Sequence, residues 1–213
     1  MAPTTSLAPS PQPTPQHTFV GTDAALQQLV KETLGNTIVV LSASIVLSNA
    51  LRLDGKPGMV FQSEPGEQHT LSGGGSGQIM VLTGATEVVI NNLILEGGVS
   101  KSAGVNESNS SFISSYSSYG YREGGMFSGG AIEVVGAAAS LTVSRSRFES
   151  CRASWSGGAV GCSEAACIFT DVVFSNCVGA AKCAALCMLS SLHLLSLFSQ
   201  FRAESTHLRF QTF

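Results

Sequence analysis

Ser128-Gly-Gly-Ala-Ile132 recurs as Ser156-Gly-Gly-Ala-Val160, and Phe148-Glu-Ser-Cys151 recurs as Phe174-Ser-Asn-Cys177. A repeat period of about 26–28 positions fits one coil of a solenoid with three strands and three turns. The glycine pairs allow sharp turns with positive φ, and the residues after them begin buried strands. We expect each Phe to stack on the other in the core, where a buried aromatic side chain contributes about 1.5–3 kcal/mol.

Short apolar runs upstream extend this pattern. Each holds three or four residues, most are rich in Val and Ile, and small or polar residues usually separate them, as is typical of short strands joined by turns. Hairpin dipeptides are nearly absent, Asp54-Gly55 being the exception, and no long helical crossover joins the runs. We therefore predict an all-β fold, a single-stranded right-handed parallel β-helix of the pectin-lyase-like kind. The runs are Ile38–Leu41, Ile45–Leu47, Leu51–Leu53, Met59–Phe61, Ile79–Leu82, Val88–Ile90 and Leu93–Leu95.

The N-terminal part contains a linker and one helix. The segment from Met1 to Gln16 holds five of the seven prolines, so residues 1–18 are predicted to be a disordered linker before a β-helix at 19–185. They show neither the basic nor the apolar part of a secretory signal, and we expect either that the protein is not exported or that its true N-terminus lies upstream. Residues 23–34 have a helical apolar stripe and are predicted to cap the open end of the β-helix.

Two further segments depart from the repeat. Residues 99–124 are serine-rich and are predicted to leave the β-helix as a loop between two coils, either a binding loop or a disordered insertion. Residues 186–213 lack Gly, Pro, Asn and Asp, and leucines recur at every third position at their start, which suggests a helix. This tail is a C-terminal cap, or it is translated intron or out-of-frame sequence. Its apolar part, 186–198, is shorter than the roughly 20 residues that span a bilayer.

The alternation of the two motifs resembles the repeat of the chlamydial polymorphic membrane proteins, in which GGA(Ile/Leu/Val) alternates with Phe-x-x-Asn. The matching segments are Gly129–Ile132, Phe148–Cys151, Gly157–Val160 and Phe174–Cys177. This chain departs from the family at the last position of the second motif, where it has Cys instead of Asn. The resemblance implies a secreted or outer-membrane surface protein with an adhesive function.

The six cysteines lie between residues 151 and 187, and their even number permits disulfides and an oxidising compartment. Cys151 and Cys177 fall at equivalent places in successive coils, and parallel strands about 4.8 Å apart allow a disulfide between them. The alternative is a ladder of buried thiols that act as small apolar side chains. Cys162 and Cys167 flank a short turn and are placed to close a loop disulfide.

A zinc site made by Cys162, Cys167, Cys183 and Cys187 is a weaker alternative. The spacings of five and four positions, with no histidine nearby, do not match the usual zinc-binding patterns. We therefore expect no metal and no cofactor.

One group of charged residues stands out. Arg145 precedes Asp171 by one full coil, so we expect an ion pair between coils on the outer surface, contributing at most about 1 kcal/mol. Arg147 and Glu149 complete a weak surface charge cluster. Enzymes on this fold cleave acidic polysaccharides with several carboxylates on adjacent strands, and the chain has only three aspartates. We assign no catalytic residue.

These observations favour a non-enzymatic extracellular or cell-surface protein, adhesive or structural, whose partners are cell-surface glycans or receptors. Only 12% of the residues are charged, the net charge is −3, and no basic stripe appears, so a nucleic acid partner is not expected. A carbohydrate-active protein of the pectate lyase kind and a truncated product without function are the alternatives.

Overall fold

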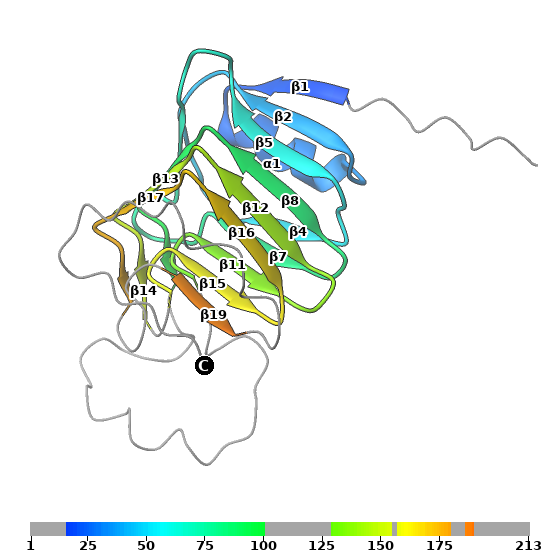
Figure 1. The fold of residues 1–213 in the computed structure, drawn as a ribbon. Helices are drawn as coiled ribbons and strands as arrows, with labels where there is room; N and C mark the ends of the chain where they lie inside the picture. The colour runs from blue at the N-terminus through cyan, green and yellow to red at the C-terminus, as the bar shows by residue number, and fades with distance from the viewer. Residues whose placement is uncertain (1–15, 101–128, 155–156, 180–185, 190–213) are drawn as a thin grey trace, which may run out of the picture.

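The structure is a computed structural model that describes residues 16–100, 129–154, 157–179 and 186–189. These residues form one helix, α1 (Asp23–Glu32), and strands that pair in parallel throughout (Figure 1). The strands belong to four sheets, here named A to D. The fold is therefore predominantly β and built of stacked parallel sheets, as the sequence predicts.

Each sheet contains equivalent strands from successive parts of the chain. Sheet A contains, in spatial order, β1 (Gln16–Val20), β2 (Thr37–Leu41), β5 (Met59–Ser63), β8 (Glu87–Asn91), β12 (Ser140–Ser144) and β16 (Ala166–Thr170). Sheet B contains β3 (Ile45–Val46), β6 (Thr70–Ser72), β9 (Ile94–Glu96), β13 (Arg147–Glu149) and β17 (Val173–Ser175). Sheet C contains β4 (Leu51–Asp54), β7 (Met80–Thr83), β11 (Ile132–Val135), β15 (Val160–Ser163) and β19 (Leu186–Leu189). Sheet D contains β10 (Val99–Ser100), β14 (Arg152–Ala153) and β18 (Val178–Gly179).

From β4 onward the chain visits these sheets in a repeating order, C, A and B, with D added from β10. We call one such passage a circuit. Each strand pairs with its equivalent one circuit later, so that β13 pairs with β17 and Phe148 lies beside Phe174. Leu95 of β9 pairs with Phe148 in the same way, although the two are much farther apart in the sequence, because residues 101–128 lie between β10 and β11. The insertion thus leaves the pairing register of the flanking circuits unchanged.

The core consists of columns of apolar side chains, one residue from each circuit. In sheet B the register aligns Ile45, Leu71, Leu95, Phe148 and Phe174, all of them buried. The rings of Phe148 and Phe174 stack with centroids 5.0 Å apart and planes 11° apart, which confirms the predicted aromatic stack. In many strands, such as β4, β5 and β12, buried residues alternate with residues that point outward.

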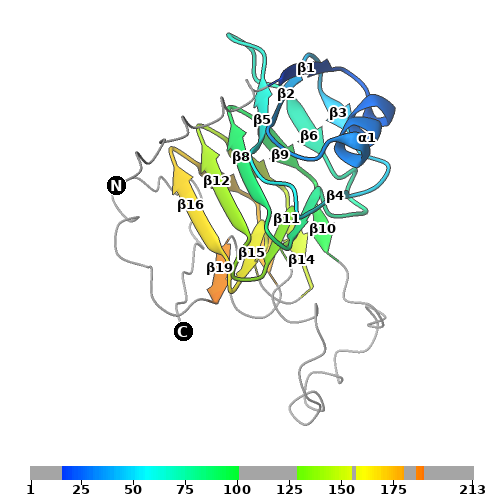
Figure 2. The same cartoon turned by 90° about the vertical axis from the view of Figure 1, so that its right-hand side faces the viewer.

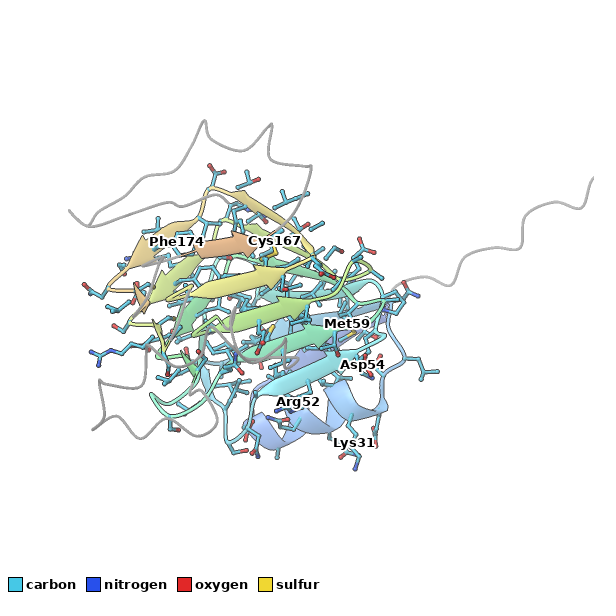
Figure 3. The ribbon with its side chains drawn as sticks, turned by 90° about the horizontal axis from the view of Figure 1, so that it is seen from below. Lys31, Arg52, Asp54, Met59, Cys167 and Phe174 are labelled. Atoms are coloured by element: carbon cyan, nitrogen blue, oxygen red, sulfur yellow. A yellow bond between two sulfur atoms is a disulfide. The ribbon has the colours of Figure 1, made fainter. Side chains whose placement is uncertain are left out.

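Buried and exposed residues are both labelled in the side-chain view (Figure 3). Met59, Cys167 and Phe174 are buried, whereas Lys31, Arg52 and Asp54 are exposed. The interior is therefore apolar and these charged groups are kept on the outside.

Left-handed residues mark the corners of the circuits. The residue that directly follows each of the last three strands of sheets A and B has a positive φ, and most of these residues are not glycine. Asn and Asp tolerate this conformation better than other residues that carry a Cβ. The residues are Asn92, Arg145 and Asp171 after sheet A, and Gly97, Ser150 and Asn176 after sheet B.

The glycine pairs of the GGA motif have a different role from the predicted one. Of the two pairs, Gly157 has a left-handed backbone, with φ of 63°, whereas Gly129 and Gly130 do not. Gly130 is needed because its backbone passes close to other backbone segments. A Cβ there would lie 2.6 Å from the carbonyl oxygen of Arg152 and would also collide with that of Gly158. Close packing between circuits, more than turn formation, requires glycine at this place.

The GGA motif also has a structural equivalent in the preceding circuit, although its residues differ from the motif. Ile132 pairs with Met80, so Gly77-Gln78-Ile79-Met80 occupies the place of Gly129–Ile132 in the preceding circuit. Ile79 and Ala131 are both completely buried. Gln78 replaces the second glycine, and its Nε2 donates to the carbonyl oxygen of Gly129 at 2.9 Å. The structural repeat therefore extends beyond the segments whose residues are alike.

The helix α1 lies at the N-terminal end of the stack, where Figure 2 shows it beside β3 and β4. Thr22 caps it by accepting a hydrogen bond from the backbone N–H of Ala25 at 3.3 Å. Leu26 and Val30 are buried in the core. The helix also binds the neighbouring loop, since Asp23 accepts from the backbone N–H of Ser48 at 3.1 Å. The predicted helix is therefore present, although it ends at Glu32 instead of residue 34.

Other segment boundaries also shift. Strand β1 begins at Gln16, so residues 16–18 belong to sheet A and not to the linker. Residues 99 and 100 form β10 at the start of the predicted loop. Residues 186–189 form a strand where a helix was suggested, because β15 offers them a parallel edge of backbone donors and acceptors. The rest of the linker, loop and tail lies outside the described residues.

Replacing Gly130 with Ala should destabilise the fold by about 2–3 kcal/mol, because the new methyl group meets backbone that cannot move aside. Gly77→Ala is the matched control: a Cβ at Gly77 meets nothing within 4 Å, so its effect should stay within about 0.5 kcal/mol. Urea denaturation of the two variants measures the difference. Equal effects would contradict the close-approach explanation.

Candidate functional site

The charged residues singled out in the sequence lie on or next to sheets A and B. Arg147 and Glu149 point outward from β13, and Arg147 Nε lies 2.9 Å from Glu149 Oε1. Their side chains are 44% and 29% exposed, so solvent screens the pair and it contributes at most about 1 kcal/mol. The expected cluster is thus in part a local ion pair within one strand.

Arg145 does not form the ion pair expected with Asp171 in the part of the chain that the structure describes. The two residues follow paired strands at equivalent places, as predicted, but the guanidinium extends toward the preceding circuit. Its Nε and Nη2 donate to Asn91 Oδ1 at 3.1 and 2.9 Å. Ser144 Oγ is 3.1 Å from the same oxygen. An amide oxygen, and not a carboxylate, therefore holds Arg145.

Glu96 is a member of this surface that sequence reasoning missed. It pairs in register with Glu149, so two carboxylates stand on neighbouring strands about 4.8 Å apart at the backbone. Arg147, on the same strand as Glu149, forms an ion pair with Glu149. The sequence does not show that the two glutamates are neighbours. Residues 101–128 lengthen the separation between equivalent residues of these two circuits. Glu96, Arg147 and Glu149 form what we call the sheet B charge group.

The described residues contain no group of three or more His, Cys, Asp or Glu side chains placed to hold a metal ion. The proposed zinc set is incompatible with the structure, because Cys162 and Cys167 are bonded to each other and a disulfide sulfur is not a thiolate ligand. Cys183 and the side chain of Cys187 lie outside the described parts of the chain. No described helix is long and apolar enough to cross a membrane.

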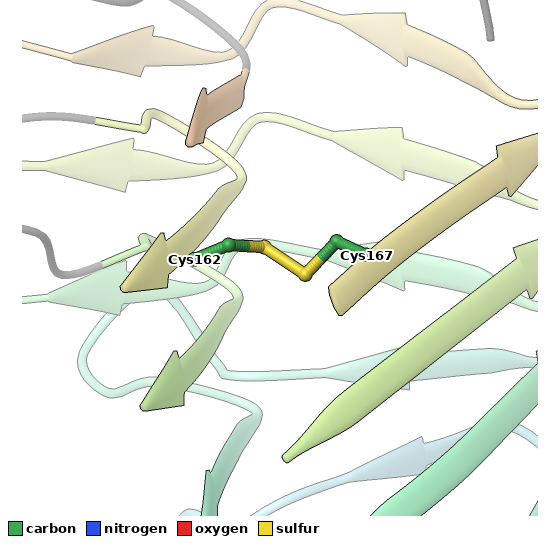
Figure 4. Close-up of a disulfide and its surroundings, with 2 residues drawn as sticks. All are labelled: Cys162 and Cys167. Atoms are coloured by element: carbon green, nitrogen blue, oxygen red, sulfur yellow. A yellow bond between two sulfur atoms is a disulfide. The ribbon is translucent and has the colours of Figure 1, made fainter. Parts of the chain in front are cut away.

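Cys162 and Cys167 form a disulfide between β15 and β16 (Figure 4). Their Cα atoms are 6.8 Å apart, and both side chains are buried. The bond therefore joins sheets C and A inside the core, across the corner between them. It encloses the turn at Glu164, whose φ of 56° is left-handed.

Apolar pairs occupy the same corner in the earlier circuits. The register aligns Cys162 with Val134 and Leu82, and it aligns Cys167 with Leu141 and Val88. The segment from Cys162 to Cys167 is shorter than the one from Val134 to Leu141. The disulfide thus takes the place of a packed apolar pair at the corner where the chain turns more tightly.

Cys151 and Cys177 are free thiols at equivalent positions of two successive circuits. Residues on both sides of them pair in the same register, since Glu149 pairs with Ser175 and Arg152 with Val178. Cys151 is fully buried and Cys177 is half-buried. The thiol ladder, and not the bridge between coils, is therefore the state present in this structure.

The two thiols influence each other's ionisation. A hydrogen bond between them raises the pKa of Cys151, and burial raises it further. The same hydrogen bond lowers the pKa of Cys177, helped by the backbone N–H of Cys151. Each thiol also lies within hydrogen-bond distance of the backbone carbonyl oxygen two residues before it, Cys151 of Glu149 at 3.3 Å and Cys177 of Ser175 at 3.5 Å. Cys177 is the more accessible of the two, and its lowered pKa makes it the thiol that ionises first.

No protein family, no curated protein and no solved structure matches this chain. What the protein does must therefore be inferred from its own residues and geometry.

Replacing Cys162 and Cys167 together with Ala should lower the free energy of unfolding by about 2 kcal/mol, because the short cross-link no longer restricts the unfolded chain. Denaturation with and without a reductant measures this. Reductant should destabilise the native protein more than it destabilises the double variant. A native protein that is insensitive to complete reduction of this bond would contradict the assignment.

Proposed function

We propose that this protein is a non-enzymatic extracellular or cell-surface repeat protein, built as a right-handed parallel β-helix of the pectin-lyase-like kind. Four stacked parallel sheets visited in a repeating order support the β-helix. The right-handed winding follows from the strong preference of crossovers between parallel strands. The GGA and Phe-x-x-Cys repeats, similar to those of the chlamydial polymorphic membrane proteins, agree with such a domain.

The single observation that carries the location is the buried disulfide between Cys162 and Cys167. Disulfides form and persist in oxidising compartments such as the cell exterior and are rare in reducing ones. This bond replaces an apolar pair at a core corner, which makes it part of the packing. A chain whose core depends on such a bond is suited to a cell surface.

Adhesive or structural action is supported by the outer faces of the sheets. A solenoid presents extended surfaces in which equivalent residues repeat along the stack. On sheet A one such row is Gln62, Asn91, Ser144 and Thr170, in which Asn91 Oδ1 already accepts from Ser144 and Arg145. Rows of amide and hydroxyl groups of this kind are suited to binding cell-surface glycans or receptors through hydrogen bonds.

A second candidate, a carbohydrate-active enzyme of the pectate lyase kind, is favoured by the sheet B charge group. Glu96 and Glu149 stand on neighbouring strands, and glycoside cleavage uses paired carboxylates. Against this candidate, Glu149 is already neutralised by Arg147. The adhesive or structural function therefore remains the better supported.

Two measurements on the intact protein test the proposal. Antibody against the protein should label intact cells of its source without permeabilisation, and added protease should remove the signal. Incubation with polygalacturonate and calcium should yield no unsaturated product absorbing in the ultraviolet and no new reducing ends. Labelling only after permeabilisation would contradict the location. Product formed by the native protein but not by Glu96→Gln/Glu149→Gln would establish the enzyme instead.

A further inference from the structure

Cys151 and Cys177 have a property that neither the fold nor the proposed function explains. They are two free thiols at equivalent places of successive circuits, and each changes the pKa of the other. A ladder of small apolar groups would need no accessible member. Yet Cys177 is half-buried, whereas Cys151 is fully buried.

We propose that Cys151 and Cys177 form an oxidisable dithiol that closes into a second disulfide and joins two successive circuits covalently. Equivalent residues of paired parallel strands lie about 4.8 Å apart, inside the range of Cα separations that disulfides accept. The flanking pairs Glu149–Ser175 and Arg152–Val178 hold this separation on both sides. Closure therefore needs rotation of two side chains and no rearrangement of the backbone.

The oxidant is a small-molecule disulfide such as glutathione disulfide. The thiolate of Cys177 attacks one sulfur of the oxidant, which forms a mixed disulfide and releases one thiolate. Cys151 then gives up its proton, attacks Sγ of Cys177 and releases the second thiolate. Two protein thiols are oxidised to one disulfide, and one small disulfide is reduced to two thiols.

The surroundings of the pair fit this order of events. The half-buried Cys177 is the sulfur that a reagent reaches first, and its lowered pKa favours the attacking thiolate. The raised pKa of Cys151 comes first from the hydrogen bond to Cys177. Once Cys177 is bound in the mixed disulfide, no thiolate remains there to hold the Cys151 proton. The buried thiol thus becomes the resolving group only after the first step.

The test uses the full chain with Cys183→Ser and Cys187→Ser, so that the remaining free thiols are those of Cys151 and Cys177. The folded protein is treated with glutathione disulfide at several pH values, trapped by alkylation, and digested with trypsin and a protease that cuts before aspartate. This separates residues 148–152, 153–170 and 171–182, which carry Cys151, the Cys162–Cys167 pair and Cys177 respectively.

We expect peptide 148–152 to be linked to peptide 171–182, with a rate that rises with pH as Cys177 ionises, and we expect reductant to release it. In the same background Cys151→Ala should keep glutathione on Cys177 with loss of the link between the peptides, and it should react more slowly at neutral pH, because Cys151 then no longer lowers the pKa of Cys177. Cys177→Ser should leave Cys151 unmodified.

Two results would overturn the proposal. One is the accumulation of glutathione on Cys177 with Cys151 still free in the parent protein. The other is a link between the two peptides that forms only in denaturant. Circular dichroism of each variant before treatment shows whether it is folded. If a variant is unfolded, the parent protein alone still shows whether the Cys151–Cys177 disulfide forms.

Discussion

Parallel hydrogen bonding between equivalent strands of successive circuits is the interaction on which the rest of this structure depends. A parallel pair cannot be closed by a tight hairpin, so the chain must travel through the other sheets before it returns. Each return places a residue beside its equivalent one circuit earlier. The column from Ile45 to Phe174 in sheet B is the direct result. Core packing, surface rows and cysteine contacts all follow from this one register.

The same register explains why the functional features come in pairs. Glu96 stands next to Glu149, and Cys151 next to Cys177, because like positions are stacked. Stacking apolar groups is favourable, whereas stacking carboxylates costs free energy unless a cation offsets the repulsion; here Arg147 forms an ion pair with Glu149. Stacking two thiols creates a site for redox chemistry. The disulfide at Cys162 is different, because it joins two sheets within one circuit and not two circuits within one sheet.

The sequence predicts the structural repeat only where successive coils contain similar residues. The Phe148–Phe174 stack was predictable because both residues recur one coil apart with Cys following each at the same distance. The equivalent segment Gly77–Met80 was not predictable, because Gln78 and Ile79 stand at the places that small residues occupy in the GGA motif. Glu96 was hidden by the insertion at 101–128, which changes the offset without changing the register.

Other details depend on side-chain direction, which spacing does not specify. Spacing allowed Arg145 to meet Asp171, but the guanidinium extends to Asn91. Spacing also does not distinguish a disulfide from two free thiols at Cys151 and Cys177. The role of Gly130 depends on how closely two backbones approach, a distance that arises only when the circuits are stacked.

The most direct test is a set of distances along one outer column of sheet A. Spin labels carried on an unnatural ketone-bearing residue at Gln62 and, in turn, at Asn91, Ser144 and Thr170 would report the spacing by electron paramagnetic resonance. The register predicts separations that grow by a constant step of about 4.8 Å from one circuit to the next. Separations that do not grow in the order 91, 144, 170 would contradict the stacked parallel arrangement.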